Sequence, residues 1–589
     1  MTRRFLWIAA VAALALGPLV LPEFYLTLLN VIGISALVVL GLVLLTGIAG
    51  LTSFGQAAFV GTAAYISAYG TTELGLSPWL TLLVGVSATA LLALALGAIT
   101  LRLSGHYLPI STIAWGAAIF FLFARIPVLG GQTGMTGIPP ITIAGYPLVT
   151  GRSYYYLIWT FVLIAMLAIT SLLRSRTGRA IRALRGGALM AESFGIDVPR
   201  TRMAVFVYAA VLAALAGWLY VHFLRFINPT PFDVTAGIEY LFMVVVGGPA
   251  SVWGAVVGAA VLTLLRNILQ DMLPRLLGQS GNFDLIVYGV LIVLLLQRTR
   301  RGIVGSIVER YPVLMPPPIA VPAVATAPLP VRQKLPPGSL FLRVIDAEKW
   351  FGGLAAVNKV GFDVRAGEIV GLIGPNGAGK STMFNLITGA STPTGGTIEV
   401  EGERVEGLSP RRIVRLGVAR TFQHVRLLRD MSVIENVMIG AHLRGRKGML
   451  AGSLRLDREE ESRLAAEAAR QLHRVGLGSE LHRRAGSLSL GQQRLVEVAR
   501  ALCADPALLL LDEPAAGLRY GEKQDLARLL SGLRDEGLAV LLVEHDMGFL
   551  MNLVDRVVVM EFGQKLVEGL PSAVQADPRV LEAYLGGVE

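Results

Sequence analysis

The fold of the second half of this chain is decided by the stretch Gly374-Pro375-Asn376-Gly377-Ala378-Gly379-Lys380-Ser381-Thr382. It follows the pattern G-x-x-x-x-G-K-[ST], whose glycines allow backbone N–H groups to close around a triphosphate. Lys380 is placed to reach the outer phosphates, and Ser381 is placed to hold Mg²⁺. Apolar residues before the loop predict a buried strand, and those after it predict a helix whose N-terminus faces the anion. We therefore expect this loop to bind ATP with Mg²⁺.

The first half of the chain has the composition of a membrane protein. The 589 residues are 54% hydrophobic and only 16% charged, which is far too apolar for an ordinary soluble protein. Residues 1–310 contain 19 arginines, no lysine and 9 acidic residues, whereas residues 311–589 contain 33 basic and 32 acidic residues. The net charge of +11 therefore belongs to the membrane half, and we expect no nucleic-acid partner.

Apolar stretches of spanning length recur along the first 310 residues. A spanning helix needs about 20 mostly apolar residues. The predicted spans are 5–21, 25–45, 54–72, 79–101, 108–125, 153–173, 204–224 and 283–298. A further stretch, 239–268, is interrupted by Gly247-Gly248-Pro249, and we interpret it as a re-entrant or discontinuous pair. We expect residues 1–310 to form an all-α polytopic permease domain of about eight spans embedded in lipid.

Arginine clusters predict the orientation of these spans. Arg3 and Arg4 precede the first span, seven arginines lie in 174–202, and three lie in 298–301. Because short arginine-rich loops face the cytoplasm, both ends of the domain are expected there. Residues 177–196 predict a short amphipathic helix. A solvated loop is the default for such a charge run, but the ATPase motifs on the same chain favour docking on that domain.

Two glycine-rich interruptions fall inside apolar runs, at 47–55 and 247–249. Irregular backbone at membrane depth needs surrounding protein or a water-filled cavity. Paired interruptions in the two halves of a transporter point to the translocation path, while helix-packing glycines explain them equally well. Glu239 begins the second apolar run, and the prolines before it favour an interfacial position over a functional one.

Residues 311–338 contain nine prolines and are expected to form an extended spacer. After it, residues 339–589 carry further motifs. Asp512 and Glu513 follow an apolar strand pattern, so Asp512 is expected to hold Mg²⁺ and Glu513 to accept a proton from the attacking water. Ser489, with Gly491 and Gln492, precedes a helix and predicts a second anion site. A nucleotide held between two such domains uses both sites.

Four single residues complete this set. His545 follows an apolar strand pattern and is expected to donate a hydrogen bond to the γ-phosphate. Gln423 is expected to contact Mg²⁺ or water and to sense the membrane domain. Phe351, with Trp350 as its rival, is placed to stack on adenine. The lone cysteine, Cys503, excludes an intrachain disulfide and is expected to pack in the core.

Together these residues resemble the motifs of the ATP-binding cassette (ABC) ATPases. The matching elements are Walker A (374–382), the Q-loop (Gln423), the signature (488–492), Walker B (508–513) and the switch His545. Residues 421–424, 513–518, 543–547 and 581–586 are similar to the ATPase subunit of high-affinity branched-chain amino acid importers. Residues 50–59, 130–137, 191–196 and 246–249 resemble a permease subunit of the same importers.

The resemblance implies an α/β P-loop ATPase at 339–589, fused to a permease that is normally a separate subunit. It implies an inner-membrane importer with a cytoplasmic ATPase and a small amino acid substrate. The implied partners are a second permease, a second cassette ATPase or a second copy of this chain, and a periplasmic solute-binding protein. The implied coupling helix lies around 179–196.

Two departures from the family and two alternatives accompany this interpretation. Leu490 stands where many cassettes have Gly, and Arg519 stands where this subfamily usually has Asn. Arg519 falls in the segment that contacts the second cassette, so its hydrogen bonding across the dimer is in question. Urea and short amides are alternative substrates. An exporter half-transporter is an alternative layout, but exporters usually have six spans and long cytoplasmic helical extensions.

Overall fold

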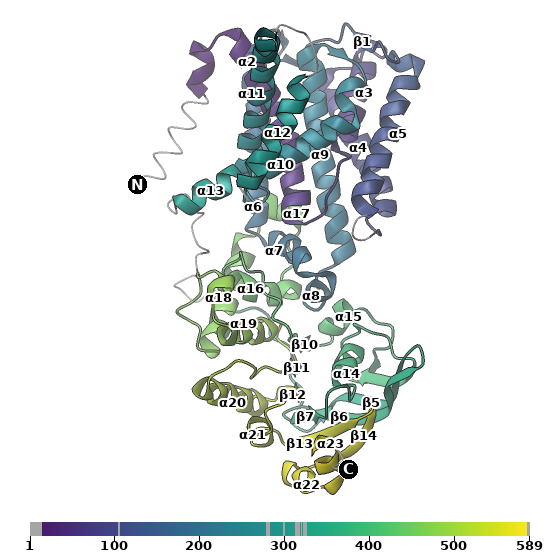
Figure 1. Ribbon diagram of the computed structural model, residues 1–589, viewed down its shortest axis with the longest axis vertical. Helices are drawn as coiled ribbons and strands as arrows, with labels where there is room; N and C mark the ends of the chain where they lie inside the picture. Colours follow the sequence, from purple (N-terminus) through teal and green to yellow (C-terminus); the bar gives the residue numbers. More distant parts are fainter. Residues whose placement is uncertain are drawn as a thin grey trace. The chain divides into compact units, whose positions relative to one another are not determined.

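The chain forms two compact units (Figure 1). One consists of Met1–Leu173 and Pro199–Pro317, and the other consists of Arg174–Val198 and Pro318–Glu589. The arginine-rich segment Arg174–Val198 thus belongs to the same unit as the phosphate loop. The structure is a computed structural model that describes residues 15–103, 107–277, 283–298, 301–311, 319, 321 and 327–585.

The described part of the first unit is mainly helical. Its helices are α2 (Glu23–Leu42), continued by the π-helix η1 (Val43–Ile48), α3 (Gln56–Thr72), α4 (Pro78–Thr100), α5 (Tyr107–Arg125), α6 (Gly151–Leu173), α9 (Val198–Leu224), α10 (Val234–Gly247), α11 (Val252–Leu277), α12 (Phe283–Arg298) and α13 (Gly302–Arg310). Two small sheets join β1 (Met135–Thr136) to β4 (Phe226–Ile227) and β2 (Thr142–Ile143) to β3 (Tyr146–Pro147).

Among the described residues, six helices are long and apolar enough to cross a membrane. They are Glu23–Ile48, Pro78–Thr100, Tyr107–Arg125, Gly151–Leu173, Val198–Leu224 and Val252–Arg275. The predicted all-α polytopic fold of the N-terminal half is confirmed, and the chain is a multi-pass membrane protein.

The remaining predicted spans have different outcomes. The stretches 54–72 and 283–298 are the helices α3 and α12, which have 17 and 16 residues. Most of the predicted span 5–21 lies outside the described residues, and residues 15–20 are helical. The stretch 239–268 divides into α10 and α11, and α11 alone is long enough to cross.

The two glycine-rich interruptions lie against neighbouring backbone and against each other. A Cβ atom added at Gly47 would lie 1.7 Å from the carbonyl oxygen of Pro249, and one added at Gly237 would lie 2.1 Å from that of Phe54. Only hydrogen fits at such distances, so these glycines allow backbones to approach closely. The packing role of the glycines is confirmed, and the translocation path stays a prediction.

Glu239 has a partner inside the same unit. Both of its carboxylate oxygens lie 2.9 Å from Arg266 Nη1, which joins α10 to α11. An ionised group is rare among apolar helices unless it is paired. The pair explains how α10 carries a carboxylate in its first half.

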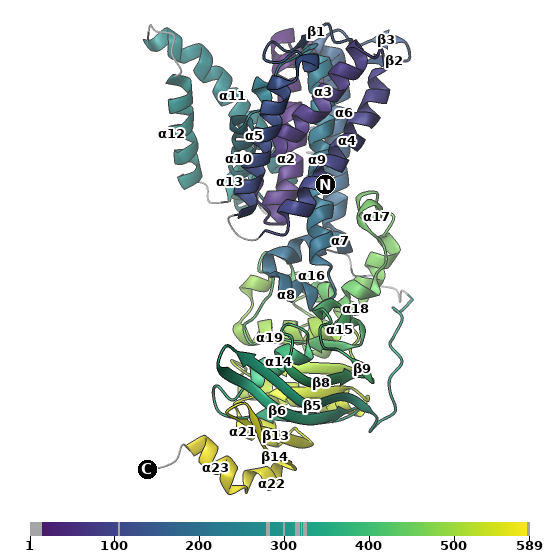
Figure 2. The ribbon, with the colours of Figure 1, turned by 90° about the vertical axis from the view of Figure 1, so that its right-hand side faces the viewer.

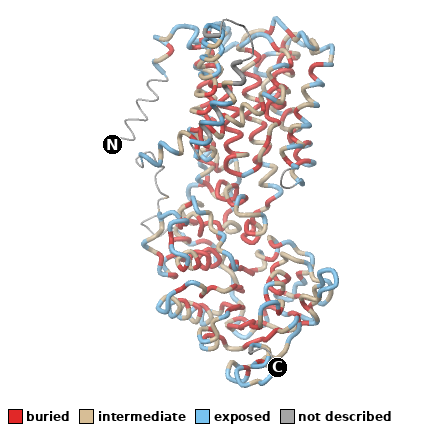
Figure 3. The backbone as a smooth tube through the Cα atoms, in the orientation of Figure 1, coloured by how far each residue is buried: buried red, intermediate tan, exposed pale blue. Residues whose placement is uncertain are grey.

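The second unit is built on a six-stranded sheet in the order β10-β11-β12-β7-β13-β14. The strands are β7 (Ile369–Ile373), β10 (Val418–Arg420), β11 (Leu508–Asp512), β12 (Ala539–Val543), β13 (Arg556–Glu561) and β14 (Gln564–Gly569). All neighbours pair in parallel except β14, which is antiparallel at one edge. Every residue of β7, β11 and β12 is buried (Figure 3), as expected for parallel strands covered on both faces. The predicted α/β P-loop fold is confirmed.

A second, antiparallel sheet has the order β6-β5-β8-β9 (Figure 2). Its strands are β5 (Leu340–Phe351), β6 (Leu354–Arg365), β8 (Gly395–Val400) and β9 (Glu403–Arg404). The helices of the unit are α7 (Arg176–Ala183), α8 (Ala188–Glu192), α14 (Lys380–Ile387), α15 (Pro410–Arg415), α16 (Val433–Gly440), α17 (Met449–Ser453), α18 (Arg458–Arg474), α19 (Leu490–Leu502), α20 (Tyr520–Asp535), α21 (Met547–Met551), α22 (Pro571–Gln575) and α23 (Pro578–Leu585). Cys503, just after α19, is free and buried in the core, as predicted.

The end of the proline-rich segment lies on the ATPase unit. Leu329 is buried in its core. The backbone N–H of Arg332 donates to Asp505 at 2.6 Å, and Lys334 Nζ donates to the carbonyl of Glu536 at 2.6 Å. Residues 327–338 therefore line the surface of the ATPase unit instead of extending away from it.

The close approach of the two interruptions predicts that Gly47→Ala destabilises the first unit, because the new Cβ overlaps the Pro249 carbonyl. We expect a loss of about 1–3 kcal/mol, measured as a lower midpoint of thermal unfolding of the full chain in detergent. The matched control is Gly289→Ala in α12, where an added Cβ meets nothing within 4 Å. Equal midpoints for the two variants would contradict this packing.

Candidate functional site

The phosphate loop joins the end of β7 to the start of α14. Gly379 precedes α14 with φ +98°, and a Cβ there would lie 2.3 Å from the carbonyl oxygen of Ala356, so only glycine fits. Lys380 folds back over the loop, where its Nζ donates to the carbonyls of Gly374 at 2.7 Å and Pro375 at 2.9 Å. The lysine thus caps the loop on the side where a phosphate chain binds.

The rest of the loop is accessible at its tip. Asn376, Gly377 and Ser381 are exposed, Thr382 is half-buried, and Ala378 is buried. Ser381 stands in the first turn of α14, where free backbone N–H groups favour an anion. The predicted stretch 374–382 therefore forms one continuous loop that leads into α14, and its tip is exposed to solvent.

Asp512 ends β11 and is buried. Burial raises the pKa of this carboxyl group, while Arg420 and Lys380 act in the opposite direction. Burial lowers the pKa of Lys380, whereas Glu513 and Asp512 raise it. The two groups therefore influence each other's charge, in the direction that favours the ionised form of both.

The structure brings the three predicted catalytic residues together. Glu513 Oε1 accepts a hydrogen bond from Gln423 Nε2 at 2.9 Å and lies 3.2 Å from His545 Nε2. Glu513 has a positive φ of 49°, a region that costs energy for a residue with a side chain and that is often found at functional sites. Three segments from different strand ends thus converge on one carboxylate.

The signature residues occupy a helix N-terminus elsewhere in the unit. Ser489 is the N-cap of α19, where its Oγ accepts from the backbone of Gln492 at 3.3 Å and Gln492 Oε1 accepts from the backbone of Ser489 at 3.2 Å. Gly491 packs against Leu518. Among the described residues, no hydrogen bond joins these signature residues to the phosphate loop.

The predicted adenine-stacking residue is at the surface. Phe351 ends β5 with 54% of its side chain exposed, and its rival Trp350 is 43% exposed. Lys349 Nζ lies 5.2 Å from the centre of the Phe351 ring. Neither aromatic side chain belongs to the core, so both are available to a ligand and the choice between them stays a prediction.

Three residues of this site lie in the stretches 421–424, 543–547 and 581–586 that resemble the importer ATPase, but no role was predicted for them. Tyr584 in α23 accepts a hydrogen bond from the backbone N–H of Gly374 at 2.7 Å. Thr421 Oγ1 accepts from the backbone of Asp512 at 3.2 Å, and Glu544 accepts from the backbone of Ala515 at 2.6 Å. The Tyr584 contact joins residues 210 positions apart, so no local pattern announces it.

The segment Arg174–Val198 is docked on the ATPase by ion pairs. Arg179 has only 1% of its side chain exposed and pairs with Glu461 on α18 at 2.6 Å. Arg182 pairs with Glu435 on α16 at 3.0 Å, and Arg176 lies 3.6 Å from Glu460. The prediction that this arginine face docks is confirmed.

The secondary structure of this segment corrects the expectation of a single helix. Two short helices, α7 and α8, are separated by the 3₁₀ turn Leu184–Gly186 and by Gly187, which has a φ of +100°. A helix cannot continue through such a conformation. The sequence period of the arginines therefore describes α7 alone. Asp197, which directly precedes α9, pairs with Arg411.

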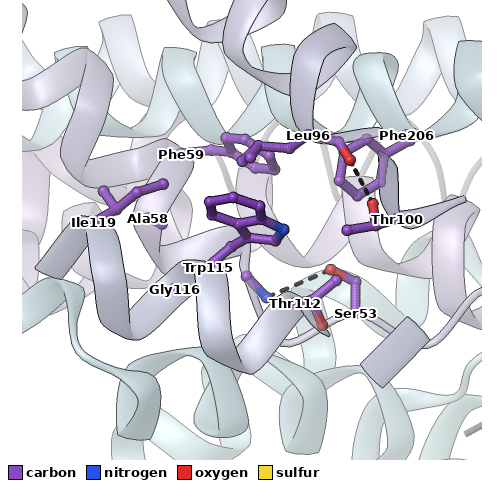
Figure 4. A pocket seen from close by; sticks show the side chains of 11 residues that line it. Ser53, Ala58, Phe59, Leu96, Thr100, Thr112, Trp115, Gly116, Ile119 and Phe206 are labelled. Carbon is purple, nitrogen blue, oxygen red and sulfur yellow. Dashed lines mark hydrogen bonds between the residues drawn. The ribbon is translucent and has the colours of Figure 1, made fainter. Parts of the chain in front are cut away.

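A small hollow lies beside the first interruption in the membrane unit (Figure 4). Ser53, Thr112 and Trp115 contribute polar atoms to its lining, and Phe59 and Phe206 contribute apolar surface. The backbone N–H of Phe54 donates to Thr112 Oγ1 at 3.1 Å. The irregular backbone is thus satisfied by protein on one side and borders the hollow on the other.

Comparisons with known proteins match each half separately. The family described as branched-chain amino acid transport system permease component matches residues 24–296, and the ABC transporter family matches residues 357–516. A branched-chain amino acid ATP-binding cassette transporter domain matches residues 564–589. The high-affinity branched-chain amino acid transport ATP-binding protein LivG of Salmonella typhimurium is 46% identical over 40% of this chain and 94% of its own length.

This chain belongs to the branched-chain amino acid family of ABC transporters. BraF, a protein of the same description from Pseudomonas aeruginosa, is 44% identical over 40% of this chain and 94% of its own length. The solved structure of a nucleotide-free ATP-binding cassette from an ABC transporter is 32% identical, covers 42% of this chain and 99% of its own, and has a TM-score of 0.38. In this ABC transporter the permease and the ATPase are fused, and ATP hydrolysis is coupled to transport.

The buried Arg179–Glu461 pair predicts that Glu461→Gln releases the docked segment. Removing one partner of a buried pair costs about 3–5 kcal/mol, so cleavage by trypsin within 174–198 should accelerate by about 100-fold or more in the full chain. The control is Glu459→Gln in the same helical turn, because Glu459 is 79% exposed and pairs only with Arg463 among the described residues. Equal cleavage rates in both variants would contradict the docking.

Proposed function

We propose that this chain is the fused permease and ATPase subunit of an importer for branched-chain or related hydrophobic amino acids. The observation that carries the proposal is the arginine segment Arg174–Val198, which lies between two helices of the membrane unit in sequence and is ion-paired to the ATPase unit. The curated relatives of the ATPase half are described as transport proteins for branched-chain amino acids, which supports this substrate class.

ATP is proposed to bind with its phosphates on the loop 374–382 and its adenine on Phe351. The oxygens of Ser381, Asp512 and Gln423 are hard ligands of the kind that Mg²⁺ prefers, and Asp512 is buried at the end of β11. The oxygen donors of these three residues therefore fit Mg²⁺, which when bound would neutralise charge on the β- and γ-phosphates.

Glu513 is proposed to act as the general base. Its carboxylate accepts a hydrogen bond from Gln423 and lies beside His545, which supports a role in accepting the proton of the attacking water. His545 is proposed to donate to the γ-phosphate as charge develops there. Gln423 reports the occupancy of this site to the segment that follows it.

The signature residues are proposed to complete the nucleotide site of a second cassette. Ser489 Oγ and the backbone N–H groups of the first turn of α19 form an anion-binding end, and Leu490 and Tyr520 beside it are 56% and 78% exposed. A partner cassette, either a second copy of this chain or a separate ATPase, would cover them. A second permease and a periplasmic solute-binding protein would complete an inner-membrane importer.

Glu513→Gln is predicted to retain ATP binding and to lower the rate of ATP hydrolysis by at least about 100-fold, since general-base catalysis contributes about 10²- to 10⁴-fold. Hydrolysis and binding of labelled ATP are measured on the purified chain in nanodiscs. Glu561→Gln, at the end of β13 and outside the cluster, is the control and should hydrolyse ATP at the native rate. A native rate in Glu513→Gln would refute the base assignment.

The substrate class is tested by uptake. Proteoliposomes that enclose ATP and hold this chain with the products of its neighbouring genes should accumulate labelled leucine. Labelled urea and acetamide are the comparison solutes. Preferential accumulation of either one would replace the amino acid assignment by an amide importer of the same architecture, and efflux of preloaded leucine would indicate an exporter.

A further inference from the structure

Three buried charged residues line one face of the signature helix. Arg494, Glu497 and Arg500 are spaced by three along α19, so they lie on one side of it. Their side chains are 8%, 1% and 0% exposed. Burial of charge is costly unless each group is paired. The partners of these three side chains therefore indicate their role.

The three side chains bind the backbone on either side of Gln423, at Phe422 and Arg426. Arg494 Nη1 donates to the carbonyl of Phe422 at 2.9 Å. Glu497 Oε1 accepts from the backbone N–H of Arg426 at 2.8 Å, and Arg500 Nη1 donates to the carbonyl of Arg426 at 2.9 Å. Gln423 lies between these two anchor points, so α19 holds its backbone on both sides.

Arg500 is contacted from the docked segment as well. The ring of Phe194 lies 4.6 Å from the guanidinium carbon of Arg500, and Phe194 is itself 1% exposed. Arg500 Nη2 donates to Glu497 Oε1 at 3.0 Å. Among the described residues, Arg500 Nε and Glu497 Oε2 have no hydrogen-bond partner, so the orientation of the pair depends on Arg426 and on the aromatic ring.

The energetics favour a positional role over a stabilising one. A buried ion pair adds little net stability compared with well-packed apolar residues. Hydrogen bonds to a backbone, in contrast, fix where that backbone lies, and a cation over an aromatic face is strongly oriented once water is excluded. A shift of the docked segment is therefore expected to shift α19 and the backbone at Arg426 as well.

We propose that Arg500 and Glu497 are positioning residues that convey the position of Phe194 in the docked segment to Gln423 and to Ser489. The proposal rests on the proposed function, because it describes how the permease side regulates the same ATPase site. Movement of Phe194 releases Arg500, which releases the backbone at Arg426 and shifts the helix that Ser489 caps. ATP hydrolysis then slows while ATP still binds at the phosphate loop.

The test compares variants of the full chain in nanodiscs, with Mg-ATP as the probe. Phe194→Leu keeps an apolar side chain but removes the ring, and it should lower kcat about tenfold with KM for ATP unchanged within about twofold. Phe194→Tyr keeps the ring and should restore kcat to within about twofold of the native value. Arg500→Lys keeps the charge but loses the double hold on Glu497 and Arg426, and it should lower kcat in the same way.

The matched control is Leu443→Ala. Leu443 contacts the next residue of the docked segment, since a Cβ added at Gly195 would lie 2.2 Å from its Cγ, and Gly195 is not part of the Arg500 contact. Its kcat should stay within about twofold of native. An unchanged kcat in Phe194→Leu, a loss in Leu443→Ala equal to that in Phe194→Leu, or a failure of Phe194→Tyr to restore kcat would overturn the proposal. Native protein that hydrolyses ATP but takes up no leucine overturns the proposed substrate. The comparison of kcat between the variants still tests the role of Arg500 and Glu497, because only hydrolysis is measured.

Discussion

Arg179 places a guanidinium group where almost none of its side chain reaches water, and Glu461 is the group that holds it there. Desolvating a lone cation costs several kcal/mol, which is on the order of the whole stability of a domain. The segment Arg174–Val198 can therefore dock only in a position that pairs Arg179 with the Glu461 carboxylate. Glu461 also accepts from the backbone N–H of Arg176. One acidic side chain on α18 therefore fixes both the start of α7 and the charge in its middle.

A short series of contacts connects the segment Arg174–Val198 to Glu513. Phe194 lies on Arg500, and Arg500 and Glu497 hold Arg426, three residues after Gln423. Gln423 in turn donates to Glu513. Each link is a hydrogen bond, an ion pair or a ring contact. Those among the buried Phe194, Arg500 and Glu497 are strengthened by the low local dielectric, whereas Gln423 is exposed. The segment Arg174–Val198 and a proposed general base are thus joined inside one compact unit.

The motifs of the nucleotide site were predictable because their chemistry is local. Glycines before Lys380, a strand before Asp512 and a helix after Ser489 are patterns of a few residues, and each has the expected secondary structure. The convergence of Gln423 and His545 on Glu513 follows once the strands before them are parallel neighbours. Tyr584 lies in the stretch 581–586 that resembles the family, but its contact with Gly374 was not predictable because it depends on how α23 returns to the sheet. The second helix of the docked segment was missed because Gly186 and Gly187 interrupt the helical pattern.

In the membrane unit, too, local structure was predictable from the sequence and long-range contacts were not. Apolar length predicted its helices well, since a helix in lipid must satisfy its own backbone. The contact between Gly47 and Pro249 joins residues about two hundred positions apart, and no period in the sequence encodes it.

The sequence by itself determined that an apolar helical half and a P-loop half share this chain, because composition, span length and the phosphate-loop pattern are properties of consecutive residues. Only the tertiary structure decided which acidic side chains hold residues 174–198, and that the buried Arg500 lies between Phe194 of that segment and the backbone beside Gln423. The reason is physical: whether a charge is solvated or buried against a partner depends on which distant backbone folds over it.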